Sequence, residues 1–414
     1  MEIEQDVVII GGGIAGLATA LALKRIGIQS LVLEKSSDLR TTGAALSLFP
    51  NAWLALDALG VSHKLTSIYT PLERGYVTNV SNGTVQEILY FGKDRNVSPT
   101  AVHRKALLEA LSEELPAHAI RYSSKLSSIE TVNHEGSPAV LHLEDGAIIK
   151  AKVVIGCDGV HSVVARWLGL KDPIHSGRYA ARGLSVFPEG HGLKHVAQQS
   201  VNASIRAGFA PLNDKEIYWF FVYKATPNKD ENLTRASPEA IVKSGLDMLA
   251  GFPSIFLDVV QQSDLATVTL APLMFRVPWD LLLKDMYKDN ITVAGDAMHP
   301  TTPDLGQGGC SSLEDAVVLA RHIGNSFILN GKIDSRALKG YVMERRFHSS
   351  LLITMSYLSG RVQQGGSGWF MKFLRDRVFY KFFGLLAGYI VNHNCGKLPG
   401  MLLTSAERNT KKLE

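Results

Sequence analysis

The start of the chain shows short apolar runs separated by a longer helical periodicity. Residues 7–10 form a continuous apolar run, which is typical of a parallel strand buried on both faces. Residues 14–26 are rich in Ala and Leu and stop at Gly27, so they predict a helix that a glycine terminates. Residues 30–33 supply a second strand. The pattern therefore predicts a β-α-β unit.

Beyond this unit the pattern shifts between helical periodicity and alternation. Residues 51–59 predict a short helix that ends at Gly60, and residues 103–115 predict an amphipathic helix. Residues 76–91 alternate around an Asn-Gly pair, and residues 141–149 surround an Asp-Gly pair. These pairs are favoured in two-residue hairpin turns, so both segments predict β-hairpins.

The second half of the chain changes from strands to helices. Residues 173–277 are mostly strand-like, with a hairpin at 207–222 and a single expected helix at 238–249. Residues 291–294 return to the buried apolar type, and everything after Ser311 has helical periodicity. Together with residues 7–10 and 153–155, the run at 291–294 makes three buried apolar strands at distant places in the chain.

This order predicts one sheet assembled from distant segments, with a second sheet inserted into it. We expect the fold class to be α/β, with a Rossmann-type domain, an inserted and mostly antiparallel β-sheet domain for the substrate, and C-terminal helices. The Rossmann-type domain is expected at residues 1–72, 100–172 and 288–350, the inserted domain at 73–99 and 173–287, and the helical region at 351–414.

Composition narrows the classes of protein that remain. Among the 414 residues, 46% are hydrophobic and 20% are charged, as in globular proteins. The net charge is only +4 and the basic residues are scattered, which argues against a nucleic-acid partner. The three cysteines lack metal-ligand spacing, and we expect reduced thiols in a reducing, cytoplasmic compartment. The first strand begins at Asp6, so no leader is expected unless one was trimmed.

The C-terminal region contains an apolar run at residues 382–391, close to Phe373, Phe379 and Tyr380. The run is too short to span a bilayer. Core packing is the expected role, with a helix over the substrate pocket and a peripheral membrane contact as alternatives.

The glycines between the first strand and the first helix fit G-x-G-x-x-G. Gly11 suits the tight turn, Gly13 allows a pyrophosphate to approach the backbone, and Gly16 allows the helix to pack against the strand. The helix start at Ile14 then offers free amides to phosphate. Glu34, at the end of the second strand, is placed to accept hydrogen bonds from a ribose. The motif does not separate FAD from NAD, and a ligand-free glycine turn is the alternative.

Two further motifs follow buried strands. Residues 153–162 read VVIGCDGVHS, and residues 291–300 read ITVAGDAMHP, continuing through Pro303 to a glycine-rich stretch at 306–309. Together with the first motif they resemble the fingerprints of the FAD-dependent aromatic hydroxylases, the single-component flavin monooxygenases. The details are most similar to plant monooxygenases related to zeaxanthin epoxidase and salicylate hydroxylase. The resemblance covers roughly residues 5–350 and implies a fold like that of para-hydroxybenzoate hydroxylase.

The resemblance also implies which residues hold the cofactor. Arg104 matches the family's arginine that contacts the flavin's phosphate and ribityl chain. Asp296 matches the aspartate that holds the ribityl hydroxyls, and Leu126 matches a residue whose backbone contacts adenine. Asp158 belongs to an element that serves both FAD and the pyridine nucleotide, and residues 43–48 run beside the isoalloxazine ring. The full expected set is Gly11, Gly13, Ile14, Ala15, Gly16, Glu34, Lys35, Ala45, Arg104, Leu126, Asp158, Gly295, Asp296, Gly306, Gly308 and Gly309.

Elementary chemistry supports parts of this assignment. A helix beginning near Ser311 or Ser312 carries about half a positive charge at its start, which suits the anionic pyrimidine edge of reduced flavin. The alternatives are an ordinary turn at Asp158, a helix cap at Asp296 and a surface ion pair at Arg104. His299 is expected to be a packed or loop histidine instead of a general base. Cys310 stands where the family often has Asn, and a thiol is the poorer donor.

One dinucleotide fold implies that NADPH or NADH docks only transiently. The resemblance implies that it reduces FAD, that O₂ forms a flavin C4a-hydroperoxide, and that one oxygen atom enters a small aromatic or alkene substrate. Pro303 matches a proline beside the reacting oxygen. The candidate substrate pocket comprises Leu46, Leu48, Arg206, Trp219 and Phe221, although aromatic strands are more often core.

Four alternatives to this pocket and activity stay open. Tyr218 and Phe220 form the opposite face of the same strand, and Arg206 is expected to be solvated. A flavoprotein reductase or oxidase without oxygen insertion, and a non-catalytic FAD-binding protein, are the other functions that the sequence allows.

Overall fold

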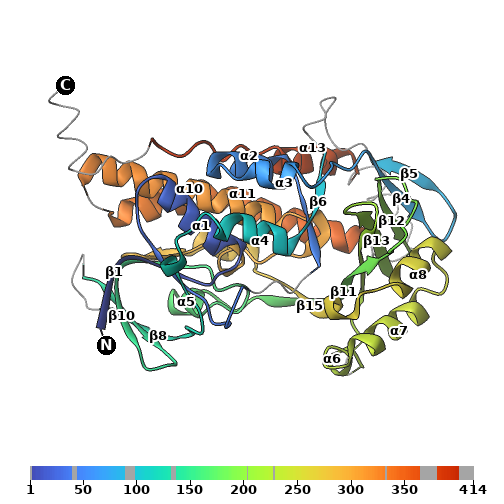
Figure 1. Ribbon diagram of the computed structural model, residues 1–414, viewed down its shortest axis with the longest axis horizontal. Coiled ribbons are helices and arrows are strands. Elements are labelled where there is room, and N and C mark those ends of the chain that lie inside the picture. The colour runs from blue at the N-terminus through green and yellow to red at the C-terminus, as the bar shows by residue number, and fades with distance from the viewer. Residues whose placement is uncertain are drawn as a thin grey trace.

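Two β-sheets lie at opposite ends of the molecule and are joined by long helices (Figure 1). The computed structural model describes residues 2–39, 44–88, 98–131, 137–202, 204–226, 229–331, 333–363 and 380–400. The first sheet has eight described strands in the order β16-β17-β10-β1-β2-β7, with β9 paired to β10 and β8 to β9. Their bounds are β1 (Glu2–Ile10), β2 (Leu31–Leu33), β7 (Ile120–Arg121), β8 (Leu126–Glu130), β9 (Ala139–Leu143), β10 (Ile148–Gly156), β16 (Tyr287–Lys288) and β17 (Ile291–Val293).

The centre of this sheet is parallel and brings the three predicted apolar runs together. Val8 pairs with Leu31 on one side and with Val154 on the other, and Val154 pairs in turn with Ile291. Val8, Val154 and Ile291 are fully buried, as expected for strands covered on both faces. The prediction that residues 291–294 complete the first sheet is therefore confirmed.

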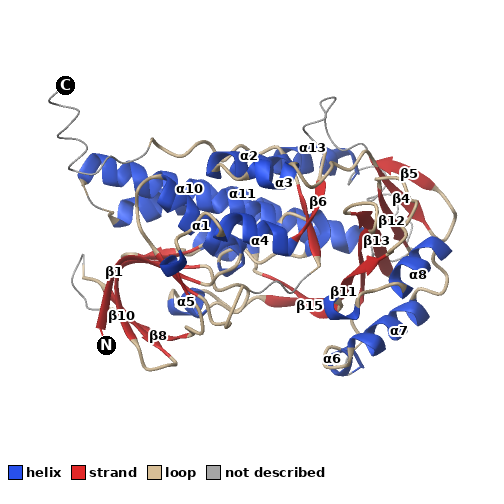
Figure 2. Cartoon of the chain, in the orientation of Figure 1, coloured by secondary structure: helices blue, strands red, loops and turns tan. Residues whose placement is uncertain are grey.

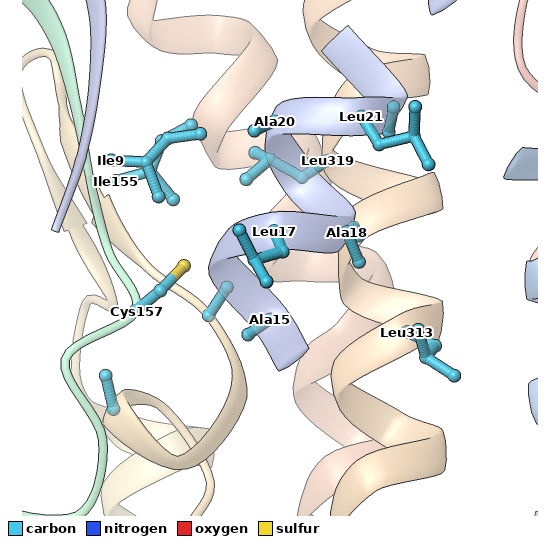
Figure 3. Close-up of a cluster of buried hydrophobic side chains, with 14 of the residues drawn as sticks. Ile9, Ala15, Leu17, Ala18, Ala20, Leu21, Ile155, Cys157, Leu313 and Leu319 are labelled. Carbon is cyan, nitrogen blue, oxygen red and sulfur yellow. The ribbon is translucent and has the colours of Figure 1, made fainter. Parts of the chain in front are cut away.

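Helix α1 (Ile14–Arg25) lies between the sheet and α10 (Gly308–Asn330). Figure 3 shows Leu17 of α1 near Ile9 and Ile155 of the strands, with Leu313 and Leu319 on α10 behind. All five side chains are fully buried. The Ala and Leu side chains of α1 thus allow the helix to pack closely against the first sheet on one side and against α10 on the other.

The second sheet has the strand order β15-β11-β14-β13-β12-β4-β5. Its pairs are antiparallel except for β12 with β4. The expected hairpins at 76–91 and 207–222 are present, although residues 89–91 lie outside the described part of the chain. The bounds are β4 (Gly75–Asn79), β5 (Val85–Ile88), β11 (Ile174–Val186), β12 (Ala197–Val201), β13 (Ile205–Pro211), β14 (Glu216–Lys224) and β15 (Thr269–Phe275).

Three helices cover one face of the second sheet, where the sequence predicted a single one. The expected helix is α7 (Pro238–Met248), and α6 (Lys229–Leu233) and α8 (Ser254–Gln261) are additional. The segment that forms α8 is short and largely apolar, so its periodicity did not distinguish a helix from a strand. Phe256, Val259 and Val260 of α8 are buried against the sheet.

The other described elements complete two lobes, which are the first sheet and the second sheet with the helices packed on each, and several of them lie between the two sheets (Figure 2). Strands β3 (Ala45–Leu48) and β6 (Thr100–His103) pair, and α2 (Pro50–Leu59), α3 (Ser62–Thr66), α4 (Arg104–Ser112), α5 (Val163–Trp167), α9 (Pro278–Leu283), α11 (Ser335–Gln363) and α13 (Tyr380–Val391) complete the set. Within the described ranges, no helix is both long and apolar enough to cross a bilayer. Phe373 and Phe379 lie outside those ranges.

Candidate cofactor site

The glycine turn after β1 is packed as the motif requires. Gly11 has φ +105°, and a Cβ there would lie 2.4 Å from the Cys157 carbonyl oxygen. A Cβ on Gly16 would lie 1.9 Å from the Gly11 carbonyl oxygen. A Cβ on Gly13, in contrast, would meet nothing within 4 Å. Two glycines are therefore fixed by packing, while the space over Gly13 is open.

The start of α1 is free to bind an anion. Its N-cap is Gly13, and no side chain caps the helix. The first amide in the helical ladder is that of Leu17, which donates to the Gly13 carbonyl. The amides of Ile14, Ala15 and Gly16 precede it, so they and the helix dipole are directed at the open space.

Glu34 lies beside this turn. It is buried, and its carboxylate accepts from the Gly12 amide at 2.7 Å and the Ser36 amide at 2.8 Å. The Ser124 amide donates to the Glu34 carbonyl, which brings the strand beginning at Leu126 to the same edge. Leu126 is itself buried and Lys35 is exposed. The predicted ribose and adenine positions therefore adjoin one another.

Asp296 is the carboxylate expected at the ribityl chain, and it lies in a 3₁₀ turn, η4 (Gly295–Ala297). It is exposed, whereas Gly295 and Ala297 beside it are buried. Although the residue reaches solvent, the surrounding protein desolvates the Asp296 carboxylate and raises its pKa, and the charges of His299, Arg104 and Arg182 oppose that rise. Arg104, the first residue of α4, was predicted here. Arg182 on β11 was not predicted, because nothing in its local pattern connects it with Asp296.

The three motifs meet at one place. A Cβ on Gly295 would lie 2.7 Å from the Ala15 Cβ, which joins the third motif to the first. A Cβ on Gly309 would lie 2.7 Å from Leu46 Cδ1 and 3.5 Å from Ile14 Cδ1. Ala45, next to Leu46, pairs with His103 just before Arg104. Residue 43 of the same predicted segment lies outside the described residues.

Helix α10 begins at Gly308, earlier than the predicted start at Ser311 or Ser312. Glycines disfavour helix interiors, so the sequence pattern placed the start after them, but in the first turn they cost little. The N-cap is Gln307, and no side chain caps the helix. Gly306 before it is left-handed, at φ +66°. The expected partial positive charge is therefore presented by Gly308 and Gly309.

A buried polar network supports this helix start, and the sequence analysis did not find it. Asn51 Nδ2 on α2 donates to Gln307 Oε1 at 2.8 Å and to Glu314 Oε1 at 2.5 Å. Arg345 on α11 pairs with Glu314 at 2.5 Å and with Asp315 at 2.7 Å. Burial disfavours ionisation of both acids, but nearby positive charge outweighs it and lowers each pKa to about 2.

His299 belongs to the same network. It is fully buried, and its Nε2 lies 2.5 Å from Asp315 Oδ2. The Asp315 carboxylate also accepts from the Gly295 amide at 2.8 Å. Its position is that of a packed histidine, as expected from the sequence. The motif Leu313-Glu314-Asp315 was visible in the sequence, but its partners are too distant in the chain to be inferred.

Asp158 and Cys310 have mainly structural contacts. The Asp158 carboxylate accepts from the Val163 amide at 2.7 Å at the start of α5, which favours the turn alternative. Its assignment to FAD and pyridine nucleotide stays a prediction. Cys310 is fully buried with its Sγ 3.5 Å from the Ser47 carbonyl oxygen, and burial raises its pKa to about 12.

Pro303 begins a second 3₁₀ turn, η5 (Pro303–Leu305), that connects the two lobes. Pro303 is exposed, while Asp304 is buried and pairs with Arg178 at 2.7 Å and Arg206 at 3.2 Å. The expectation that Arg206 is solvated is wrong, because Asp304 and the Phe220 ring, 5.4 Å from its guanidinium carbon, hold it inside. Asp304 and Arg178 were missed by the sequence analysis.

The face of strand β14 that was expected to line the substrate pocket lies in the core of the second sheet and its helices. Trp219 and Phe221 are buried in the core beneath α7 and α8, and a Cβ on Gly245 of α7 would lie 2.7 Å from Phe221. Tyr218 instead packs against the larger hydrophobic core, which extends from the first sheet to residues of the second. Leu48 is also fully buried, whereas Leu46 is half-buried. Trp219, Phe221 and Leu48 are therefore core residues, and Tyr218 lies on the opposite face of the strand.

The fold and the site define a class of protein, and comparison with known proteins agrees. Residues 4–356 match the FAD binding domain family, so the chain belongs to that family. The relatives that it matches are FAD-dependent monooxygenases of the aromatic-hydroxylase type. It is a flavoprotein oxidoreductase with FAD as its cofactor. The described residues fit FAD. The open space over Gly13 and the uncapped start of α1 suit its phosphates. The uncapped start of α10 suits the flavin edge, and the exposed Asp296 suits the ribityl hydroxyls.

The individual relatives are monooxygenases. The chain is 40% identical to Monooxygenase 2 of Arabidopsis thaliana over 95% of this chain and 98% of the relative. It is 36% identical to Monooxygenase 1 of the same plant, over 88% and 92%. Klebsiella pneumoniae HpxO, solved with FAD and uric acid, shares the fold at TM-score 0.80 and 21% identity, over 95% of this chain and 98% of that one.

Proposed function

We propose that this protein is an NAD(P)H-consuming monooxygenase that inserts one oxygen atom from O₂ into a small aromatic or alkene substrate. The observation that carries the proposal is the meeting of three distant motifs at one site. Gly11 lies against Cys157 of the second motif, and Gly295 of the third motif lies against Ala15 of the first. When bound, the flavin supplies the redox and oxygen chemistry, and the protein supplies position, charge and exclusion of water.

Each part of the site has a proposed role toward the cofactor. The amides at the start of α1 bind the diphosphate, and Glu34 accepts from the ribose while Leu126 supports adenine. Asp296 accepts from the ribityl hydroxyls, and Arg104, whose charge acts on Asp296, balances it. The amides of Gly308 and Gly309 stabilise negative charge on the pyrimidine edge of the ring.

The substrate side of the site is proposed to be the face of the second sheet that carries Tyr218 and Phe220. This face also carries Arg182, which is exposed and whose charge acts on both Asp296 and Tyr218. Asp304 is buried in its ion pairs with Arg178 and Arg206, while the adjacent Pro303 is exposed. We therefore propose that the substrate lies between Pro303, Arg182 and Tyr218.

Two further points remain part of the proposal. We propose that the boundaries at 1–72, 100–172 and 288–350 delimit the FAD domain, which is supported by the sheet to which their strands belong. We also propose that NADPH or NADH binds only transiently. The described residues contain one G-x-G-x-x-G turn, and the proposal assigns that turn to FAD, so the nicotinamide cofactor has no dinucleotide-binding turn of its own. Uric acid in HpxO supports a small planar substrate of this kind.

The test is oxygen incorporation measured together with nicotinamide oxidation. The purified flavoprotein is supplied with NADPH or NADH under ¹⁸O₂ and a panel of phenols, aromatic acids, purines and alkenes. A substrate that accelerates nicotinamide oxidation and gains one ¹⁸O atom, with the other reduced to water, supports the proposal. Nicotinamide oxidation that yields only hydrogen peroxide across the panel indicates a reductase or oxidase, and no stimulated oxidation indicates a non-catalytic flavoprotein.

A further inference from the structure

Three side chains of types that bind metals meet at helix α10, beside the buried network described above. Glu314 lies on α10, His348 on α11 and His393 just after α13. His348 Nε2 and His393 Nδ1 each lie 3.4 Å from Glu314 Oε2. One ligand atom from each residue lies within 4.8 Å of the other two. The three elements are distant in sequence, so spacing did not reveal the cluster.

The cluster is buried and its hydrogen bonding is incomplete. Glu314 and His348 have side chains that are 0% and 4% exposed, and that of His393 is 20% exposed. Among the described residues, neither nitrogen of His348 nor Nδ1 of His393 has a hydrogen-bond partner of acceptable geometry. Oε2 of Glu314 likewise has no such hydrogen bond, although it forms an ion pair with Arg345 at 2.5 Å. Buried polar atoms rarely stay unsatisfied, and a shared ion is one recognised explanation.

The atoms have the spacing of a metal site. Tetrahedral zinc bound at about 2.0–2.2 Å places neighbouring ligand atoms about 3.3 Å apart, close to both separations from Glu314 Oε2. Imidazole nitrogen and carboxylate oxygen are both common ligands of zinc.

We propose that Glu314, His348 and His393 bind one divalent zinc-class ion, with a fourth position open toward the partly exposed His393. Two histidines and a glutamate form a ligand set that zinc uses with an open fourth position. The ion is structural in this proposal, because it joins α10, α11 and the segment after α13.

The residues around Glu314 act as a supporting layer. Asn51 holds Oε1, and Arg345 pairs with Oε2, which orients the carboxylate toward the histidines. Arg345 opposes a cation, but Glu314 and Asp315 together carry two negative charges against its one. Asn51 also holds Gln307, the N-cap of α10. The ion therefore stiffens the helix start that faces the flavin.

The experiment measures zinc on the untagged, FAD-loaded full-length chain. The protein is stripped with EDTA, desalted and titrated with zinc against a chromophoric chelator, and bound metal is counted by mass spectrometry. His348→Ala and His393→Ala remove one ligand each. His322→Ala is the matched control, because His322 also joins α10 to α11, through Glu344 at 2.9 Å, away from the cluster.

Wild-type and His322→Ala proteins are expected to take up one zinc per chain and to melt at a higher temperature with zinc than without it. Each cluster variant is expected to bind zinc at least tenfold more weakly and to lose the zinc-dependent rise in melting temperature. Equal zinc uptake by wild type and His393→Ala overturns the proposal, as does the absence of stoichiometric uptake by wild type. His393→Ala decides the matter if His348→Ala fails to fold, since His393 lies nearest the surface.

Discussion

At the scale of single residues, Asp296 tests the proposed contact with the ribityl hydroxyls of FAD most directly. It is exposed among buried neighbours, and Arg104 and Arg182 act on its charge. We expect Asp296→Ala to weaken FAD binding about tenfold to a hundredfold, because hydrogen bonds to a charged acceptor contribute about 1.5–3 kcal/mol. Equilibrium dialysis with FAD measures this loss, and an unchanged affinity would remove Asp296 from the site.

The pH dependence of FAD binding follows from the same carboxylate. Desolvation raises the pKa of Asp296 in the folded protein, and hydroxyl donors favour its ionised form. FAD affinity should therefore hold at neutral pH and fall as the pH is lowered through that raised pKa. Asp296→Asn cannot titrate and should show weaker but flatter binding between pH 7 and 4.5. Parallel curves for the two proteins would contradict this assignment.

The three cysteines offer a second residue-scale test. Cys157, Cys310 and Cys395 are unpaired and at most 8% exposed. Burial also raises the pKa of Cys310 to about 12, so its reactive thiolate is scarce at pH 8. We expect a thiol reagent to label no cysteine in the native protein and all three in denaturant. Rapid native labelling of Cys310, located by peptide mass spectrometry, would disprove this packing.

At the scale of elements, the turn between β1 and α1 provides a matched pair of glycine variants. A Cβ on Gly16 would overlap the Gly11 carbonyl oxygen at 1.9 Å, whereas one on Gly13 would meet nothing within 4 Å. Gly16→Ala should therefore destabilise the apoprotein by about 1–3 kcal/mol or more. Gly13→Ala should retain apoprotein stability but bind FAD more weakly, because its methyl group occupies the phosphate space.

Denaturant unfolding and FAD titration of both variants separate the two effects. If Gly13→Ala lost stability as Gly16→Ala does, the space over Gly13 would not be open. If it bound FAD as wild type does, the diphosphate would lie elsewhere.

The elements were largely predictable because each follows from local periodicity. The parallel strands, α1, α7 and the hairpins formed where apolar patterning placed them, and turn residues marked their ends. Helix α8 was missed because a short apolar segment fits a strand equally well. The start of α10 was misplaced because its two glycines disfavour a helix by propensity. At position 309 the close packing against Leu46 nevertheless requires a glycine.

At the scale of the whole molecule, the two lobes are connected by a buried ion cluster that could not be predicted. The glycine-and-acid motifs identified the cofactor side because each motif is local. Arg178, Arg206 and Asp304 come from β11, β13 and η5, so only the tertiary fold brings them together. The same limit applies to the face of β14, because alternation identifies two faces without showing which one meets the other lobe.

Asp304 should consequently be important for the stability of the whole protein. Its carboxylate is 1% exposed, and the side chains of Arg178 and Arg206 are 6% and 8% exposed. Asp304→Ala leaves two buried guanidinium groups without their acid, and removing one partner of a buried pair typically costs about 3–5 kcal/mol. Urea unfolding measures this loss.

The matched control is Glu144→Ala, which removes the exposed pair with Lys125, whose side chains are 54% and 55% exposed. Exposed pairs contribute little, so this variant should unfold at nearly the wild-type urea concentration. Equal unfolding midpoints for Asp304→Ala and Glu144→Ala would show that the buried cluster does not hold the lobes together.

The late position of β17 and α10 has a consequence for biosynthesis. When a ribosome has released residue 156, the nascent chain holds β1, β2 and β10, but Ile291, which pairs with Val154, has not been made. The apolar surface of α1 that α10 later covers stays exposed to solvent while the residues of the inserted sheet are translated. During that interval the growing polypeptide is most prone to aggregate, and chaperones that shield apolar surface should determine its yield.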